Sequence, residues 1–91
     1  MDLEVRYQFK KELAARGFKG PKAPNGTMAL HDEYLSSVGV GELMAELVLR
    51  REKVFRIASI VGIVEAKKRF DDISAAIEAL QIVVEALEVS T

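Results

Sequence analysis

The sequence contains no cysteine and no tryptophan, and it has only two prolines among its 91 residues. The lack of cysteine excludes disulfide bonds and thiolate metal sites. A chain of this length buries only about 60–65% of its unfolded surface when it folds alone, so its margin of stability is small. Small proteins without disulfides or metals often gain stability by oligomerising. A chain without cysteine is also compatible with a reducing compartment, and we expect a cytoplasmic protein.

Long apolar segments are missing as well. The longest run, "IASIVGIV" at residues 57–64, is far shorter than the roughly 20 residues that cross a bilayer. The first residues, "MDLEVRYQF", lack the basic segment and apolar core of a signal peptide. We therefore expect neither a membrane anchor nor a targeting segment.

Positive charge is absent from the last part of the chain. Residues 70–91 contain no Lys or Arg and carry a net charge of −5, whereas residues 50–69 carry +5. A basic segment followed by an acidic one favours antiparallel self-pairing, in which two copies neutralise each other. The basic segment also suits a phosphate backbone, so both kinds of partner stay open.

Two patterns compete over residues 2–16. Alternation of apolar and polar residues from Leu3 to Phe9 is typical of a strand, whereas apolar residues at every fourth position from Val5 to Leu13 are typical of a helix. We favour the helix, because a lone strand finds few partner strands elsewhere in the chain. Asp2 is a suitable N-cap for it and Gly17 a suitable left-handed C-cap.

A loop separates this helix from the rest of the chain. Residues 17–27, "GFKGPKAPNGT", hold three glycines and two prolines, which predict irregular structure. We therefore divide the chain into an N-terminal arm, residues 1–27, made of a helix and a basic loop, and a helical oligomerisation domain, residues 28–91.

The domain begins with a predicted short helix at residues 28–37 and a second helix that starts near Glu42, after Ser37, Gly39 or Gly41. The β-branched residues of 54–64 favour a strand, but a strand would cut short the good helix former before it. We favour a long helix through this segment, buried on all sides at the centre of an oligomeric bundle. Gly62 would there allow two backbones to approach closely.

Residues 73–87 carry apolar side chains at coiled-coil spacing, and further apolar residues surround most of that helix. Such a helix needs more neighbours than this chain offers, so we expect a second subunit. The sequence leaves open whether the chain breaks near Phe70–Asp72 into a hairpin or continues as one bent helix. The predicted oligomer interface consists of Leu43, Leu47, Val54, Phe55, Ala58, Val61, Ile73, Ile77, Leu80, Val84 and Leu87.

Patterns that resemble catalytic sites are better explained by structure. His31 is the only histidine and has acidic neighbours, but neither an oxyanion-hole motif nor a phosphate loop accompanies it. The segment "GVGE" at 39–42 lacks the Gly-Lys-Ser/Thr ending of a phosphate loop and predicts a helix start.

Four acidic residues are candidates for a magnesium site. Glu42 and Glu46 lie one helical turn apart, with Asp71 and Asp72 further along the chain. Solvent-exposed helix faces and caps account for these carboxylates. We therefore predict no catalytic residue, no cofactor and no metal.

Clustered cations support a nucleic-acid hypothesis. Glu52 and Glu65 interrupt the clusters, and no helix-turn-helix, zinc-finger or RNP signature is present. The candidate nucleic-acid contacts are Lys19, Lys22, Arg50, Arg51, Lys53, Arg56, Lys67, Lys68 and Arg69.

Together these patterns predict an all-α protein, a small helical bundle with a long central helix that homo-oligomerisation completes. The expected function is that of a non-catalytic scaffold, adaptor or regulator that acts through contacts with itself or with another protein. A regulator that binds nucleic acid is the alternative, and an enzyme is not expected.

Overall fold

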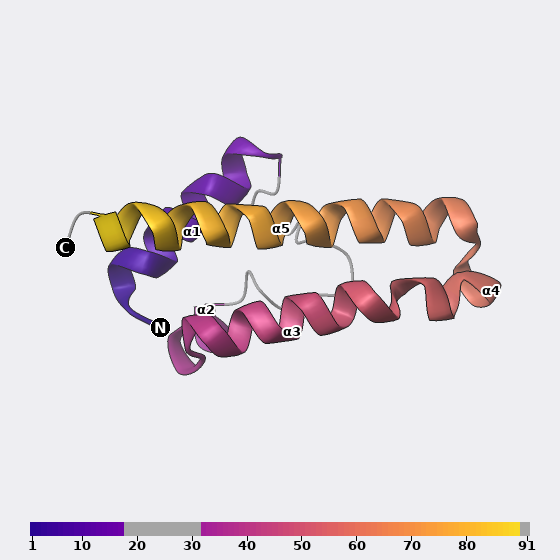
Figure 1. Ribbon diagram of the computed structural model, residues 1–91, viewed down its shortest axis with the longest axis horizontal. Helices are drawn as coiled ribbons and strands as arrows, with labels where there is room; N and C mark the ends of the chain where they lie inside the picture. The colour runs from indigo at the N-terminus through magenta and orange to yellow at the C-terminus, as the bar shows by residue number, and fades with distance from the viewer. Residues whose placement is uncertain (18–31, 90–91) are drawn as a thin grey trace.

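The computed structural model describes residues 1–17 and 32–89, and every element within these ranges is helical. An antiparallel hairpin dominates the structure (Figure 1). Its first branch consists of α3 (Val40–Lys53), the 3-10 turn η1 (Val54–Ile57) and α4 (Ala58–Val61), and its second branch is α5 (Ile63–Val89). The predicted all-α fold class is confirmed for the described part of the chain.

The N-terminal helix α1 (Leu3–Ala15) forms as its sequence predicts. The Asp2 side chain accepts a hydrogen bond from the backbone N–H of Glu4 at 2.8 Å, which satisfies a donor that the helix cannot satisfy itself. Gly17 follows the helix with a φ of +95°, a left-handed conformation that glycine adopts without strain. The interpretation of residues 3–9 as a helix is therefore confirmed, as are both caps.

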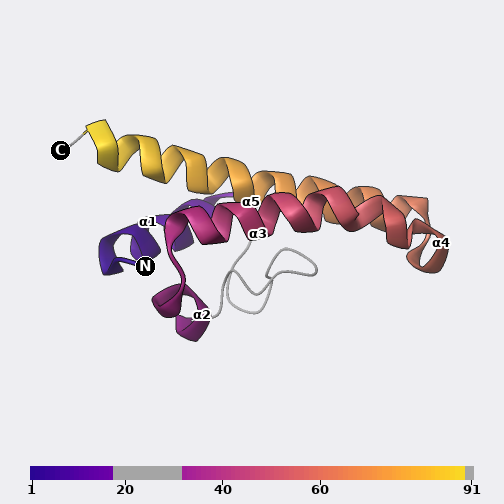
Figure 2. The same cartoon turned by 60° about the horizontal axis from the view of Figure 1, so that its bottom comes forward.

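Two buried residues of α1 pack it against the hairpin. Phe9 and Leu13 lie one helical turn apart and are fully buried in the same core as residues of α3 and α5. The short helix α2 (Asp32–Ser37) contributes Leu35, and Val38 follows it into this core. Figure 2 shows α1 and α2 at the end of the hairpin that lies opposite α4. The predicted basic loop after Gly17, with Lys19 and Lys22, lies outside the described residues, and so does His31.

The chain reverses at Gly62, which has a φ of 90° and a ψ of 154°. Only glycine adopts this conformation without strain. No atom lies within 4 Å of where a Cβ would stand, so Gly62 makes a turn and does not allow a close backbone approach. The two alternatives considered for Phe70–Asp72, a break or a single bent helix, are both wrong, because α5 runs straight through these residues and the turn precedes it.

Residues 54–64 are helical in type, as favoured above, but they do not form the middle of a long buried helix. A 3-10 turn and a four-residue α-helix lead to the turn at Gly62. Ile60, Ile63 and Val64 are 81%, 64% and 82% exposed. The single chain does not bury these three side chains, and their burial within an oligomer stays a prediction.

The core lies between the two branches of the hairpin and beneath α1. Buried alanines on α5, namely Ala66, Ala76 and Ala79, leave room for the larger side chains that interdigitate from the facing helices. Six residues of the predicted oligomer interface are buried in this core within one chain: Leu43, Leu47, Val54, Ile73, Ile77 and Leu80. Contacts between two chains would have to use other side chains.

Replacement of Gly62 by alanine tests the turn. A Cβ would meet no atom within 4 Å, so the cost is backbone strain alone, and we expect Gly62→Ala to lower the free energy of unfolding in urea by about 1–3 kcal/mol. The matched control is Gly41→Ala, because Gly41 lies within α3, has no positive φ and also has open space around its Cβ position. Its stability should be unchanged or rise by up to about 1 kcal/mol. Equal stabilities of the two variants would contradict the turn.

A second pair of variants tests the core. Leu80 is fully buried, so Leu80→Ala should lower the free energy of unfolding by about 2–5 kcal/mol through lost contacts and a residual cavity. Leu49→Ala is the matched control, because the same substitution is made at a position that is 44% exposed. It should lower the free energy of unfolding by about 1 kcal/mol or less. Denaturation followed by circular dichroism measures both, and a similar loss in the two would show that Leu80 lies outside the core.

Candidate functional site

The turn of the hairpin carries a cluster of exposed apolar side chains. We call Ile60, Ile63 and Val64 the apolar tip, since these residues flank Gly62 at the far end of both branches. Large aliphatic side chains in contact with water are common singly, whereas grouped ones are typical of interaction sites. The tip is therefore the first part of the candidate site.

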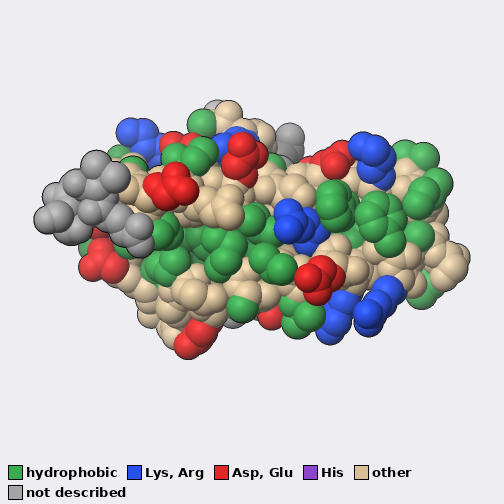
Figure 3. Space-filling view, in the orientation of Figure 1, with side chains coloured by type: hydrophobic (Ala, Val, Ile, Leu, Met, Phe, Trp, Pro, Cys, Tyr) green, Lys and Arg blue, Asp and Glu red, His purple; other side chains and the backbone are tan. Residues whose placement is uncertain are grey.

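The tip continues into the seam between α3 and α5. Ile63, Phe70, Ser74 and Gln81 are separated by seven, four and seven residues, a spacing that places them along one side of α5. We call this side the seam face. α1 crosses behind α5 in Figure 1, so the space-filling view in the same orientation shows the side turned away from α1. Hydrophobic side chains gather there along the seam and at the end where α4 lies (Figure 3).

A groove occupies the other end of the seam, where α3 begins and α5 ends. Its volume is about 290 Å³, and apolar atoms of Val40, Met44 and Val84 make up much of its lining. Gly41, Gln81 and Glu85 complete it. We call this the open-end groove. It accepts apolar side chains and has a carboxylate at its edge.

An aromatic cluster lies between the groove and the tip. The rings of Phe55 from η1 and Phe70 from α5 have centroids 5.4 Å apart and an interplanar angle of 36°. The guanidinium of Arg51 lies 5.7 Å from the centre of the Phe70 ring, and its Nη1 donates to the Ser74 hydroxyl at 3.5 Å. This cluster joins the two branches and leaves Phe55 47% exposed on the surface.

Local ion pairs neutralise part of the basic segment 50–69. Arg50 pairs with Glu46, Lys67 with Asp71 at 3.2 Å, and Arg69 with Glu65 at 3.3 Å, each one helical turn apart. With Arg51 held at Phe70, four of the seven candidate nucleic-acid contacts in this segment already have intramolecular partners.

The remaining three cations of the segment, Lys53, Arg56 and Lys68, are exposed. Lys53 ends α3, Arg56 belongs to η1, and Lys68 lies in the second turn of α5, so all three lie in the tip half of the hairpin. The structure therefore brings the candidate cations of α3, η1 and α5 together at one end.

Negative charge follows directly along α5. Partial burial raises the pKa of Asp72; Lys68 opposes the rise, whereas Asp71 and Glu65 add to it. A raised pKa means that the ionised carboxylate is less favourable in the folded chain than in the unfolded one.

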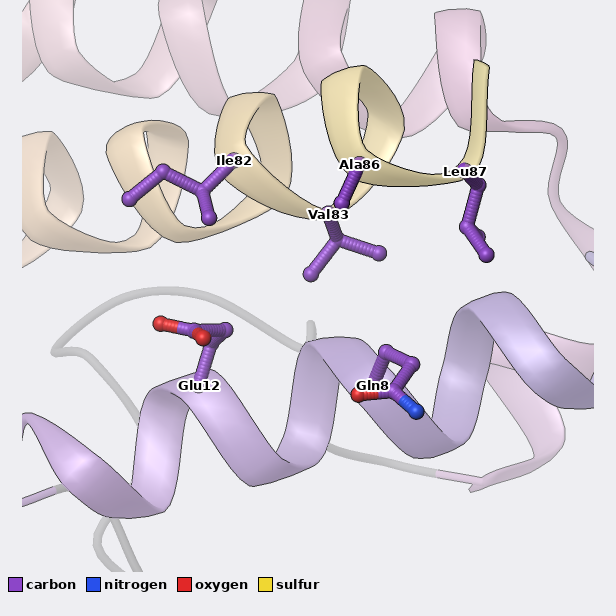
Figure 4. Close-up of a pocket in the computed structure, with 6 residues that line it drawn as sticks. All are labelled: Gln8, Glu12, Ile82, Val83, Ala86 and Leu87. Atoms are coloured by element: carbon purple, nitrogen blue, oxygen red, sulfur yellow. The ribbon is translucent and has the colours of Figure 1, made fainter. Parts of the chain in front are cut away.

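A second pocket lies between α1 and α5 (Figure 4). Gln8 and Glu12 from α1 face Ile82, Val83, Ala86 and Leu87 of α5 across a volume of about 270 Å³. One carboxylate and one amide are its only functional side chains, which gives it neither a nucleophile–base pair nor a set of metal ligands. We assign it to the packing of α1.

The other sequence candidates have structural roles within the described ranges. "GVGE" includes the start of α3, with Gly39 as N-cap and Glu42 in the first turn, as predicted. No group of three or more acidic, His or Cys side chains that could hold a metal ion occurs in residues 1–17 and 32–89. Of the predicted interface, Ala58, Val61, Val84 and Leu87 are partly buried against the core, and Phe55 is exposed.

The sequence interpretation missed the tip residues and the groove residues Val40 and Met44. A signal for the tip was present: Gly62 divides an apolar run that three cations follow, which is compatible with a turn as well as with a helix. No helix within the described ranges is long and apolar enough to cross a membrane.

Comparison with known proteins adds no relative: no family model, no curated protein and no solved structure matches the chain. Its function has to be inferred from the chain's own geometry.

Proposed function

We propose that this protein is a non-catalytic scaffold or adaptor that acts by self-association through its seam face. The observation that supports the proposal is the apolar tip, whose three branched side chains are between 64% and 82% exposed. Ile63 of the tip lies on the same side of α5 as Phe70 of the aromatic cluster and Gln81 of the groove. A surface of this kind is typical of a protein contact.

The energetics favour a protein partner over solvent. Full burial of one isoleucine or valine side chain contributes about 1.5–3 kcal/mol. The tip residues do not gain this within their own chain, because it leaves them largely exposed. A symmetric dimer repeats the contact, once for the tip of each protomer, which makes a tip contact effective despite its small size.

The alternative, nucleic-acid binding, has weaker support. Lys53, Arg56 and Lys68 are available for phosphates, but the other cations of segment 50–69 already have local partners. An apolar tip between them also has no evident role on a phosphate backbone, which is polar throughout.

Removal of the tip side chains tests self-association. We expect the double variant Ile60→Ser/Ile63→Ser to raise the dissociation constant at least tenfold, since each buried isoleucine contributes more than 1.4 kcal/mol. Light scattering over a concentration series measures the change, and circular dichroism checks that helicity is retained. Leu3→Ser is the matched control, because Leu3 is 72% exposed on α1, away from the seam face, and should leave association unchanged. A wild-type chain that stays monomeric at every concentration would refute the proposal.

Charge reversal separates the two functions. Lys53→Glu/Arg56→Glu changes two exposed cations of the tip half, and we expect it to weaken self-association. The wild-type chain should show no binding to mixed-sequence DNA or RNA in a fluorescence titration. Binding that weakens steeply with salt, and that the charge reversal abolishes while the oligomer persists, would instead support the nucleic-acid alternative.

A further inference from the structure

The hairpin carries opposite charges at its two ends. The tip half, residues 50–69, has a net charge of +5, whereas α5 beyond it contains acidic residues and no cation. The open end also holds Glu42, exposed in the first turn of α3, and Glu85, at the edge of the groove. The molecule is 45 Å long, several times the ~8 Å over which physiological salt screens charge, so the two ends act as separate poles.

We infer that the partner is a second copy of this chain in antiparallel orientation, with the apolar tip of each protomer seated in the open-end groove of the other. The inference rests on the proposed function and adds the partner and its orientation. Each contact is complementary in two ways. The isoleucines of the tip meet a groove that is lined by apolar side chains. The exposed cations of the tip half, Lys53, Arg56 and Lys68, lie on the side of the contact that faces Glu42 and Glu85.

Orientation follows from the same charges. A parallel dimer would place two basic tips together and two acidic ends together, and like charges in contact are unfavourable. In the antiparallel dimer a two-fold axis repeats the tip-in-groove contact, so both tips and both grooves are used and the assembly closes at two copies. The two-fold axis would lie near the middle of α5, close to the exposed Phe55 and to Phe70.

The two orientations differ in a measurable distance. Ile63 and Val84 are 21 residues apart on α5, which corresponds to about 31 Å along a helix that rises 1.5 Å per residue. In the antiparallel dimer the two tips are separated by roughly this length, whereas tip and groove are in contact. A disulfide needs Cα atoms within about 7 Å, so it can form only between tip and groove.

Single cysteines test the inference, because the natural chain contains none. Gly41→Cys marks the groove, where a Cβ meets nothing within 4 Å, and Ile63→Cys marks the tip, where the side chain is 64% exposed. After mild oxidation, each variant alone should remain uncrosslinked, and an equimolar mixture should give a disulfide-linked dimer on a non-reducing gel. Tyr7→Cys, at a position on α1 that is 62% exposed, replaces Gly41→Cys in the control mixture and should give no crosslink.

The outcomes separate the inference from the proposed function. Crosslinking of Ile63→Cys with itself, or a dimer in light scattering without a mixed crosslink, would overturn the antiparallel arrangement and leave self-association standing. A chain that is monomeric in light scattering would overturn both. If the wild-type chain sediments with vesicles that contain phosphatidylserine and Ile63→Ser abolishes this without a change in oligomeric state, the tip belongs to a membrane surface and the inference is wrong.

Discussion

Gly62 turns the chain in a backbone conformation that other residues adopt only with strain, and the side-by-side packing of the two long branches depends on that turn. Because the turn falls between α4 and α5, it brings the basic segments on either side of it to one end of the molecule. The same turn leaves the apolar side chains next to it without neighbours. The position of the basic segments and the exposure of the apolar tip therefore both result from the backbone conformation at Gly62.

The core of the single chain explains why any self-association would use the surface and not the heptad-spaced residues. Leu43 and Leu47 of α3 are buried together with Leu80 of α5 in one core. Phe9 and Leu13 of α1 cover α5 from one side. The opposite side of α5, along the seam, has no such cover. Phe70 and Val84 on this side are partly buried against the core, and Phe55 beside Phe70 is exposed.

Much of the fold could be predicted from the sequence, because its signals are local. Asp2, Gly17 and Gly39 act at helix ends through their own backbone and side chain, so their roles hold in any tertiary context. The all-helical class follows from the long stretch without proline. The turn at Gly62 could not be predicted in this way, since a lone glycine is compatible with both a helix interior and a chain reversal.

The candidate site was harder to predict, for a physical reason. Heptad spacing at Ile73, Ile77 and Leu80 predicts that these side chains share one face of the helix, but it does not predict which helix covers that face. The covering helix turned out to be α3 of the same chain, which could be known only after the reversal at Gly62 was placed. Exposure of Ile60 and Ile63 depends on the same reversal, so neither the core of the single chain nor this surface could be predicted before the turn was placed.

The hairpin and α1 also differ in how far along the chain their contacts reach. Contacts between the branches begin next to the turn and extend outward from it, so each new pair closes only a short additional loop, the situation associated with fast folding. α1 joins from the other end of the sequence: its Arg16 lies 3.4 Å from Glu78, a partner 62 residues away. Closing a loop of that length costs more chain entropy than closing the short turn between the branches.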